Sequence, residues 1–314
     1  MELSPISCSN KYEESFLQTC VGVKSDNTAS MAIKYGIVLI ALLAGCLAKP
    51  TLDTLDGEAD MSMFFEHVDP DSRILGGAPA VAGSAPYMVA LASGTLVKNY
   101  ACGGSLISTR TVLTAAHCIR AQYGWNGLSS SLQGRVGSLN WQRGGTTMSF
   151  RRNVTHPHYV HHDIKNDIGL LITTSAVRLT ASVQTTPLSF QHVGAGVVVK
   201  ATGWGHTKWN GATSNVLREL TLSTISGTEC ARRVRQDAID FDYAAPAVDP
   251  ALELCVYHSV GHGMCTGDSG SALVRVDTGA QVGVVSWGFP CAVGTPDMFA
   301  RVSAYEDFIR NNVA

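Results

Sequence analysis

The chain has 314 residues, of which 45% are hydrophobic and 15% charged, and its formal net charge is -2. This length and hydrophobic content allow one or two buried cores, and the charged fraction is too low for a disordered protein. Because the net charge is slightly negative, there is no basic field to attract nucleic acid or an anionic membrane, and we expect neither as a partner.

The N-terminal region is interpreted as an extension followed by a signal peptide. Residues 1–30 are polar and would hold the following apolar segment away from the N-terminus, so we expect translation to begin at Met31. Residues 31–48 contain a lysine and then an apolar run of about 13 residues that ends in small residues near Ala48. A spanning helix needs about 20 residues, which favours a cleaved signal and secretion over an anchor. A short cytoplasmic tail before a signal anchor is the alternative.

An acidic segment follows at residues 49–73. It carries seven Asp and Glu residues against Lys49 and Arg73, and it has no periodic apolar face. This composition predicts a solvated, poorly ordered segment. The segment ends abruptly at the Arg73-Ile74 junction, where the character of the sequence changes.

The remainder, residues 74–314, consists of short apolar runs separated by Gly, Ser and Asn turns. The runs are too short for helices and predict an all-β barrel or sandwich. At the C-terminal end, Val302, Tyr305, Phe308 and Ile309 share one helical face, which predicts a single closing helix.

Nine cysteines divide into three before residue 74 and six after it. An even set downstream of a secretory segment indicates three disulfides formed in an oxidising compartment, with free buried thiols as the alternative. Sequence spacing alone leaves the pairing open. The six are Cys102, Cys118, Cys230, Cys255, Cys265 and Cys291.

Three motifs carry the chemistry. TAAHC at residues 114–118 supplies His117, NDIGLL at 166–171 supplies Asp167, and GDSG at 267–270 supplies Ser269. A serine hydroxyl is a weak nucleophile at neutral pH and needs a base to remove its proton. The chain order His, Asp, Ser distinguishes this triad from those that other folds build.

On these motifs the chain resembles the chymotrypsin/trypsin-like serine endopeptidases. The resemblance implies two packed six-stranded antiparallel β-barrels with a C-terminal helix, joined by a linker near residues 184–193, with the triad in the cleft between them. It implies that Ser269 attacks the peptide carbonyl, that His117 takes its proton and that Asp167 orients the imidazole. The implied disulfides pair Cys102 with Cys118, Cys230 with Cys255, and Cys265 with Cys291.

The same resemblance implies supporting roles for further residues. Ser286, just before a Trp-Gly pair, matches the serine that bonds the triad carboxylate, and the N–H groups of Gly267 and Ser269 match the oxyanion hole. Cleavage after Arg73 by a trypsin-like protease would free the ammonium of Ile74.

That ammonium would pair with the buried carboxylate of Asp268, which is costly to bury alone. The pair would order the oxyanion turn and the specificity pocket. This predicts a zymogen, whose cysteine-free segment 49–73 leaves after cleavage.

The specificity pocket departs from the tryptic pattern. Trypsin-like members carry Asp six residues before the nucleophile, whereas this chain has Gly263 there, followed by Met264. Together with Gly288 at the pocket mouth, a glycine floor favours apolar or aromatic substrate side chains. Asp297, however, stands where the family usually has glycine, and its carboxylate would accept Arg or Lys from another direction.

This pocket pattern resembles arthropod chymotrypsin-like or collagenolytic digestive proteases, and it favours chymotrypsin-like or broad cleavage, because an off-axis charge selects weakly. The alternatives are tryptic cleavage through Asp297, or an Asp297 that points away and bonds backbone amides.

Two further features are interpreted as parts of the protein surface. Four histidines crowd residues 156–162, and we expect a surface loop there and no metal site. Asn153 begins a glycosylation sequon.

Together these features predict a secreted, extracellular, monomeric serine endopeptidase zymogen, and its simple architecture favours a digestive role, with a cascade or defence role as the alternative. It would act on polypeptides, meet protein inhibitors and need no cofactor. A catalytically inactive homologue that binds a partner is the competing hypothesis.

Overall fold

The computed structural model describes residues 76–125 and 127–314. The expected N-terminal extension, signal peptide, acidic segment and Arg73-Ile74 junction lie outside the described residues. Among those described, no helix combines the length and the apolar character that crossing a bilayer requires.

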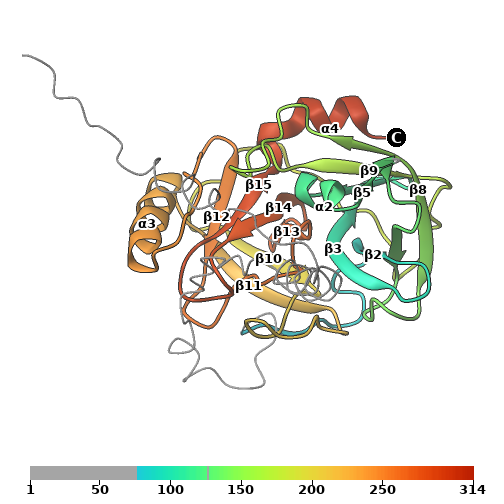
Figure 1. The fold of residues 1–314 in the computed structure, drawn as a ribbon, viewed down its shortest axis with the longest axis horizontal. Coiled ribbons are helices and arrows are strands. Elements are labelled where there is room, and N and C mark those ends of the chain that lie inside the picture. The colour runs from blue at the N-terminus through green and yellow to red at the C-terminus, as the bar shows by residue number, and fades with distance from the viewer. Residues whose placement is uncertain (1–75, 126) are drawn as a thin grey trace, which may run out of the picture. The chain divides into compact units, whose positions relative to one another are not determined.

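The first half of the described chain closes into an antiparallel barrel in the strand order β2-β3-β4-β9-β8-β7 (Figure 1). Its strands are β2 (Met88–Ser93), β3 (Asn99–Leu106), β4 (Thr111–Thr114), β7 (Gln133–Val136), β8 (Thr146–Thr155) and β9 (Gly169–Thr173). A short helix, α2 (Ala116–Arg120), follows β4, and a small hairpin of β5 (Tyr123–Gly124) and β6 (Gly127–Leu128) follows α2.

The second half forms another six-stranded ring. Its strands are β10 (Val198–Gly203), β11 (Arg218–Thr224), β12 (Glu253–Tyr257), β13 (Ala272–Arg275), β14 (Gln281–Gly288) and β15 (Asp297–Arg301). The order β11-β10-β13-β14-β15-β12 is closed by pairing of β12 with the last two residues of β11, and β1 (Ala78–Pro79) pairs with the first two residues of β11. The predicted pair of six-stranded antiparallel barrels is therefore confirmed.

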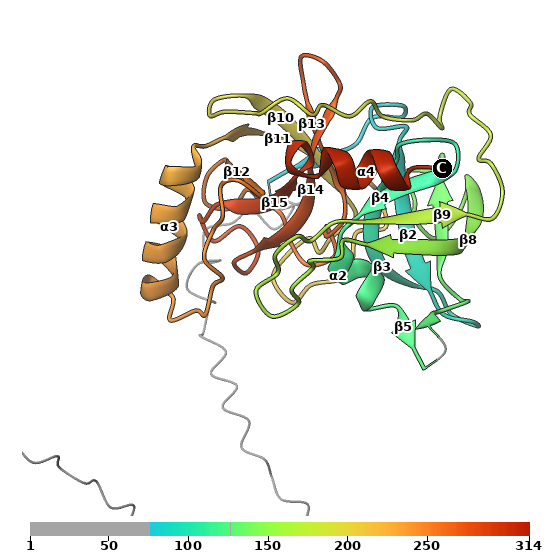
Figure 2. The same cartoon turned by 90° about the horizontal axis from the view of Figure 1, so that it is seen from above.

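The helices are few. The predicted C-terminal helix is present, but it opens with a 3-10 turn, η2 (Val302–Tyr305), before α4 (Glu306–Asn312). Helix α4 lies over the first barrel, where the backbone N–H of Ala314 donates to Thr111 Oγ1 at 2.9 Å (Figure 2). The sequence interpretation missed the short α2 and also α3 (Gly227–Asp240), which packs beside β12. The Oγ of Ser226 caps it by accepting the Glu229 N–H at 3.1 Å.

Hydrogen bonds between the barrels hold the Ser269 turn against the first barrel. The side chain of Ser105 donates to Gln281 Oε1 at 2.7 Å, both residues being fully buried. The Gly103 N–H in β3 donates to the carbonyl oxygen of Ser269 at 2.8 Å, which attaches the Ser269 turn directly to the first barrel. The expected linker near residues 184–193 runs between β9 and β10, the last strand of one barrel and the first of the other.

Candidate active site

His117 and Asp167 meet at the edge of the first barrel. His117 lies in the first turn of α2, and Asp167 comes two residues before β9. His117 Nδ1 lies 2.7 Å from Asp167 Oδ2, and the backbone N–H of His117 donates to Asp167 Oδ1 at 2.8 Å. Ser286 Oγ, from β14 of the second barrel, donates to the same Oδ2 at 2.6 Å. The buried carboxylate is thus held by three donors from both barrels.

This arrangement controls the proton on the imidazole. Burial lowers the pKa of His117, but the charge of Asp167 and its hydrogen bond raise the pKa, and the net shift is upward. Because Asp167 accepts from Nδ1, the neutral ring keeps its proton there, and Nε2 is left as the basic atom. A base with a raised pKa is a stronger proton acceptor for an alcohol.

The backbone turn of the GDSG motif sets the position of Ser269. Gly267 and Gly270, on either side of it in the motif, have φ of +94° and +79°, in the region where side chains are strained. A Cβ on Gly270 would lie 2.2 Å from Thr114 Oγ1, so the turn presses against the segment that leads into His117. No hydrogen bond joins Ser269 to His117 in the described chain, where His117 Nε2 lies 3.6 Å from Cys118 Sγ. Backbone contacts therefore hold the Ser269 turn against β3 and against the segment that leads into His117.

Asp268 is fully buried. Its Oδ1 accepts the Gly205 N–H at 2.8 Å and its Oδ2 accepts the Cys265 N–H at 3.0 Å. Burial raises the pKa of Asp268 to about 6, although these two hydrogen bonds oppose the shift. Glycine is required at Gly203 and Gly205, where a Cβ would approach the carboxylate oxygens to 2.1 and 2.4 Å. Residues 76–125 and 127–314 supply no ion-pair partner for it.

A cavity of about 270 Å³ opens beside Ser269 and is lined by Met264, Trp287, Gly288 and Asp297, among others. The carboxylate of Asp297 lies against both glycine positions of the pocket: a Cβ on Gly263 would lie 2.8 Å from Oδ2, and one on Gly288 would lie 3.2 Å from Oδ1.

Asp297 is almost completely buried, and its Oδ2 accepts the Met264 N–H at 3.0 Å. Burial raises the pKa of Asp297 to about 7. Asp297 therefore lines the cavity while its carboxylate bonds a backbone amide, which combines two of the arrangements predicted from the sequence.

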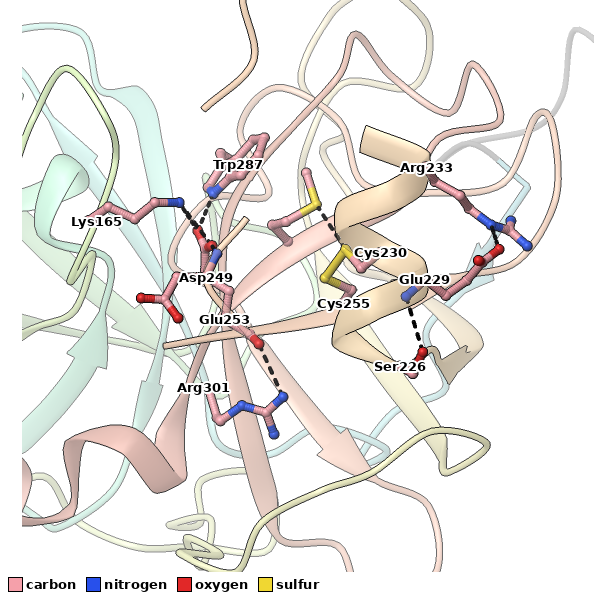
Figure 3. Close-up of a disulfide and its surroundings, with 11 residues drawn as sticks. Lys165, Ser226, Glu229, Cys230, Arg233, Asp249, Glu253, Cys255, Trp287 and Arg301 are labelled. Carbon is pink, nitrogen blue, oxygen red and sulfur yellow. Dashed lines mark hydrogen bonds and ion pairs between the residues drawn. A yellow bond between two sulfur atoms is a disulfide. The ribbon is translucent and has the colours of Figure 1, made fainter. Parts of the chain in front are cut away.

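Three disulfides brace the site. They join the pairs that the resemblance implies: Cys102 to Cys118, Cys230 to Cys255, and Cys265 to Cys291. The first adjoins His117, the last belongs to the cavity wall, and the second ties α3 to β12 (Figure 3).

The other sequence candidates lie apart from the cavity. The ring of His156 packs at 5.3 Å from that of Tyr305, and His162 forms an exposed pair with Asp163. Asn153 in β8 donates from Nδ2 to the hydroxyl of Tyr123 at 2.6 Å.

One contact at the cavity wall was not foreseen. Trp287 Nε1 donates to Oε1 of the buried residue Glu253 at 2.6 Å. The two residues are 34 positions apart in sequence, and no motif marks Glu253.

Comparison of the sequence with known proteins gives the same classification as the fold. Residues 74–309 match the sequence model of the Trypsin family. Chymotrypsin-2 of Vespa crabro is 33% identical over 240 residues, covering 76% of this chain and 99% of that protein. Trypsin alpha-4 of Lucilia cuprina is 31% identical over 76% of this chain and 87% of its own length, and trypsin of Xenopus laevis is 33% identical over 78% and 92%. The chain belongs to the trypsin family of serine endopeptidases.

Proposed function

We propose that this endopeptidase cleaves peptide bonds with Ser269 as nucleophile, His117 as general base and Asp167 as the group that orients the base. The observation that carries the proposal is the 2.7 Å contact of His117 Nδ1 with an Asp167 Oδ2 that also accepts from Ser286. It holds the imidazole in the tautomer whose Nε2 takes the serine proton and later returns it to the leaving amine.

The oxyanion of the tetrahedral intermediate would be bound by the N–H groups of Gly267 and Ser269. Within the described residues neither N–H donates to a protein acceptor, so both are free for a ligand oxygen. Removal of one such donor typically costs about 3 to 4 kcal/mol of transition-state stabilisation. The left-handed φ of Gly267 supports this role, because a side chain at that position would strain the turn.

The chain is a secreted zymogen in this proposal, with the signal at residues 31–48 and cleavage after Arg73. Asp268 supports it, since a buried carboxylate whose pKa is raised to about 6 is stabilised by a cationic partner. The ammonium freed at Ile74 would be that partner. Gly76, two residues later, lies against the ring of His262, beside the pocket residue Gly263.

The favoured specificity is chymotrypsin-like or broad. With glycine at position 263 against Asp297 and with Gly288 in its lining, the cavity would take apolar and aromatic side chains, and the Asp297 carboxylate is partly engaged by the Met264 N–H. Cleavage after Arg or Lys is the second candidate, because Asp297 nevertheless lines the cavity. Both kinds of name, chymotrypsin and trypsin, occur among the relatives.

For cellular location, biological role and partners, the proposal keeps the predictions made from the sequence. We propose an extracellular digestive monomer that acts on polypeptides, is activated by a trypsin-like protease, is open to protein inhibitors and carries a glycan at Asn153.

Covalent labelling tests the catalytic claim. The purified chain is cleaved after Arg73, treated with an organophosphate and analysed for modification of Ser269, with Ser269→Ala as the control. Stoichiometric labelling after cleavage and slow labelling before it are expected. Absence of labelling in correctly cleaved protein would favour the inactive, partner-binding homologue, and equal labelling before cleavage would refute the zymogen.

A further inference from the structure

Glu253, the first residue of β12, is a buried carboxylate with three donors. Lys165 Nζ lies 2.8 Å from both of its oxygens. Trp287 Nε1 donates to Oε1 at 2.6 Å, and the backbone N–H of Asp249 donates to Oε2 at 2.7 Å. Figure 3 shows these groups converging on the one side chain. Every donor is charged or fixed in the backbone or a ring, so the carboxylate has a defined position.

The donors come from functionally different parts of the molecule. Lys165 belongs to the first barrel, in the loop that carries Asp167 two residues later. Trp287, in β14, forms a wall of the cavity beside Ser269. Glu253 therefore connects the loop of the triad carboxylate to the surface that a substrate would contact.

Trp287 is held on two sides. Its edge is fixed by the hydrogen bond to Glu253, and Lys165 Nζ lies 5.2 Å from the centroid of its ring. A cation at this distance from an indole face is attracted to it. Ile164, the residue before Lys165, packs in the same apolar cluster as Trp287. The position of the indole thus depends on the loop as well as on the barrel.

The loop needs this external support. Ile164 and Asn166, on either side of Lys165, have φ of +48° and +54°. Such conformations are costly for residues other than glycine and persist only where the surroundings impose them.

A buried ion pair adds little net stability compared with apolar packing of the same volume. The ion pair of Lys165 and Glu253 is therefore best explained by its effect on the positions of the neighbouring groups, and not by its effect on stability.

We propose that Glu253 is a positioning residue that, through Lys165 and Trp287, sets the substrate-contacting wall of the cavity in register with the Asp167 loop. The inference rests on the proposed cavity beside Ser269 being the substrate site. The hydrogen bonds of Asp167 with His117 and Ser286 do not pass through Glu253. Losing the network should consequently weaken substrate binding and leave the chemical step largely unchanged.

Kinetics of the processed enzyme on a peptide amide with an aromatic residue before the scissile bond test this. Lys165→Met and Glu253→Gln are each expected to raise KM about tenfold, as for loss of one charged hydrogen bond, with kcat within about twofold. Lys165→Arg keeps the cation and should restore KM.

Arg233→Met is the matched control, because Arg233 likewise pairs with a glutamate, Glu229, and lies over an aromatic ring, that of Tyr257, but on α3. It should leave both constants unchanged. A fall in kcat at constant KM, or an equal effect of Arg233→Met, would overturn the proposal.

A readout without activity separates this inference from the catalytic proposal. In Ser269→Ala protein, the indole N–H resonance of Trp287, assigned by its loss in Trp287→Phe, should move upfield in Lys165→Met and in Glu253→Gln. An unmoved resonance would refute the positioning role. Failure of organophosphate labelling in the unsubstituted enzyme would instead count against the proposed active site.

Discussion

Replacing Asp297 by asparagine tests how the pocket selects its substrates. Burial raises the pKa of this carboxyl to about 7, so the group changes charge between pH 6 and pH 8. At pH 6 about one molecule in eleven carries the charge, and at pH 8 about ten in eleven do. Preference for Lys over Phe before the scissile bond should therefore rise about tenfold across this interval.

The assay is the ratio of kcat/KM for two peptide amides that differ only in Lys or Phe at that position. Titration of His117 affects both substrates equally and cancels in the ratio. In Asp297→Asn the ratio should be flat with pH. At pH 8 it should be lower than in the unsubstituted enzyme by about 1.5 to 3 kcal/mol, the range for hydrogen bonds to charged groups, which is about ten- to hundredfold. A ratio that is independent of pH in both proteins would refute the role of the carboxylate in the pocket.

The same substitution has a stability consequence whose sign is unusual for a carboxyl. The pKa is raised from 3.8 to about 7 by folding, so the folded state binds the proton more tightly. The resulting stabilisation is complete below about pH 4 and is lost as pH rises to about 7, by at most about 4 kcal/mol for three pKa units. Urea unfolding should show that Asp297→Asn flattens this decline. An unchanged pH dependence would mean that the carboxyl is solvated.

Three further outcomes are expected. Ser286→Ala removes one of the donors to Asp167 and should lower kcat about tenfold with little change in KM, a loss of about 1.4 kcal/mol, and an unchanged kcat would show that Ser286 does not support the triad. Asp268→Asn should stabilise the uncleaved chain in thermal unfolding yet abolish the gain in labelling on cleavage, and normal activation of this variant would exclude the proposed ion pair. Replacing Cys230 and Cys255 by alanine opens a loop of 25 residues and should cost about 3 to 4 kcal/mol in urea unfolding, so a cost near zero would contradict the entropic account.

Residues whose role follows from their own chemistry and local spacing were predicted from the sequence. His117, Asp167 and Ser269 each lie in a short motif, and the motifs occur in one diagnostic order. The two barrels were predicted from the family resemblance, and the short apolar runs supported that prediction. Helix α3 was missed because few of its residues face the core: Cys230 and Val234 are its buried ones. A capping signal was present, with serine at position 226 and glutamate three residues later.

The roles of Asp297 and Glu253 could not be predicted from their neighbours in the sequence. Whether Asp297 lines the cavity or bonds an amide depends on Gly263 and Met264 in one segment and on Gly288 in another, and in the fold Asp297 does both. Glu253 is more remote still, since its cation lies 88 positions away in the other barrel. Burying a carboxylate is unfavourable until all its partners are in place, so the positioning role that we propose for Glu253 depends on the two barrels being assembled.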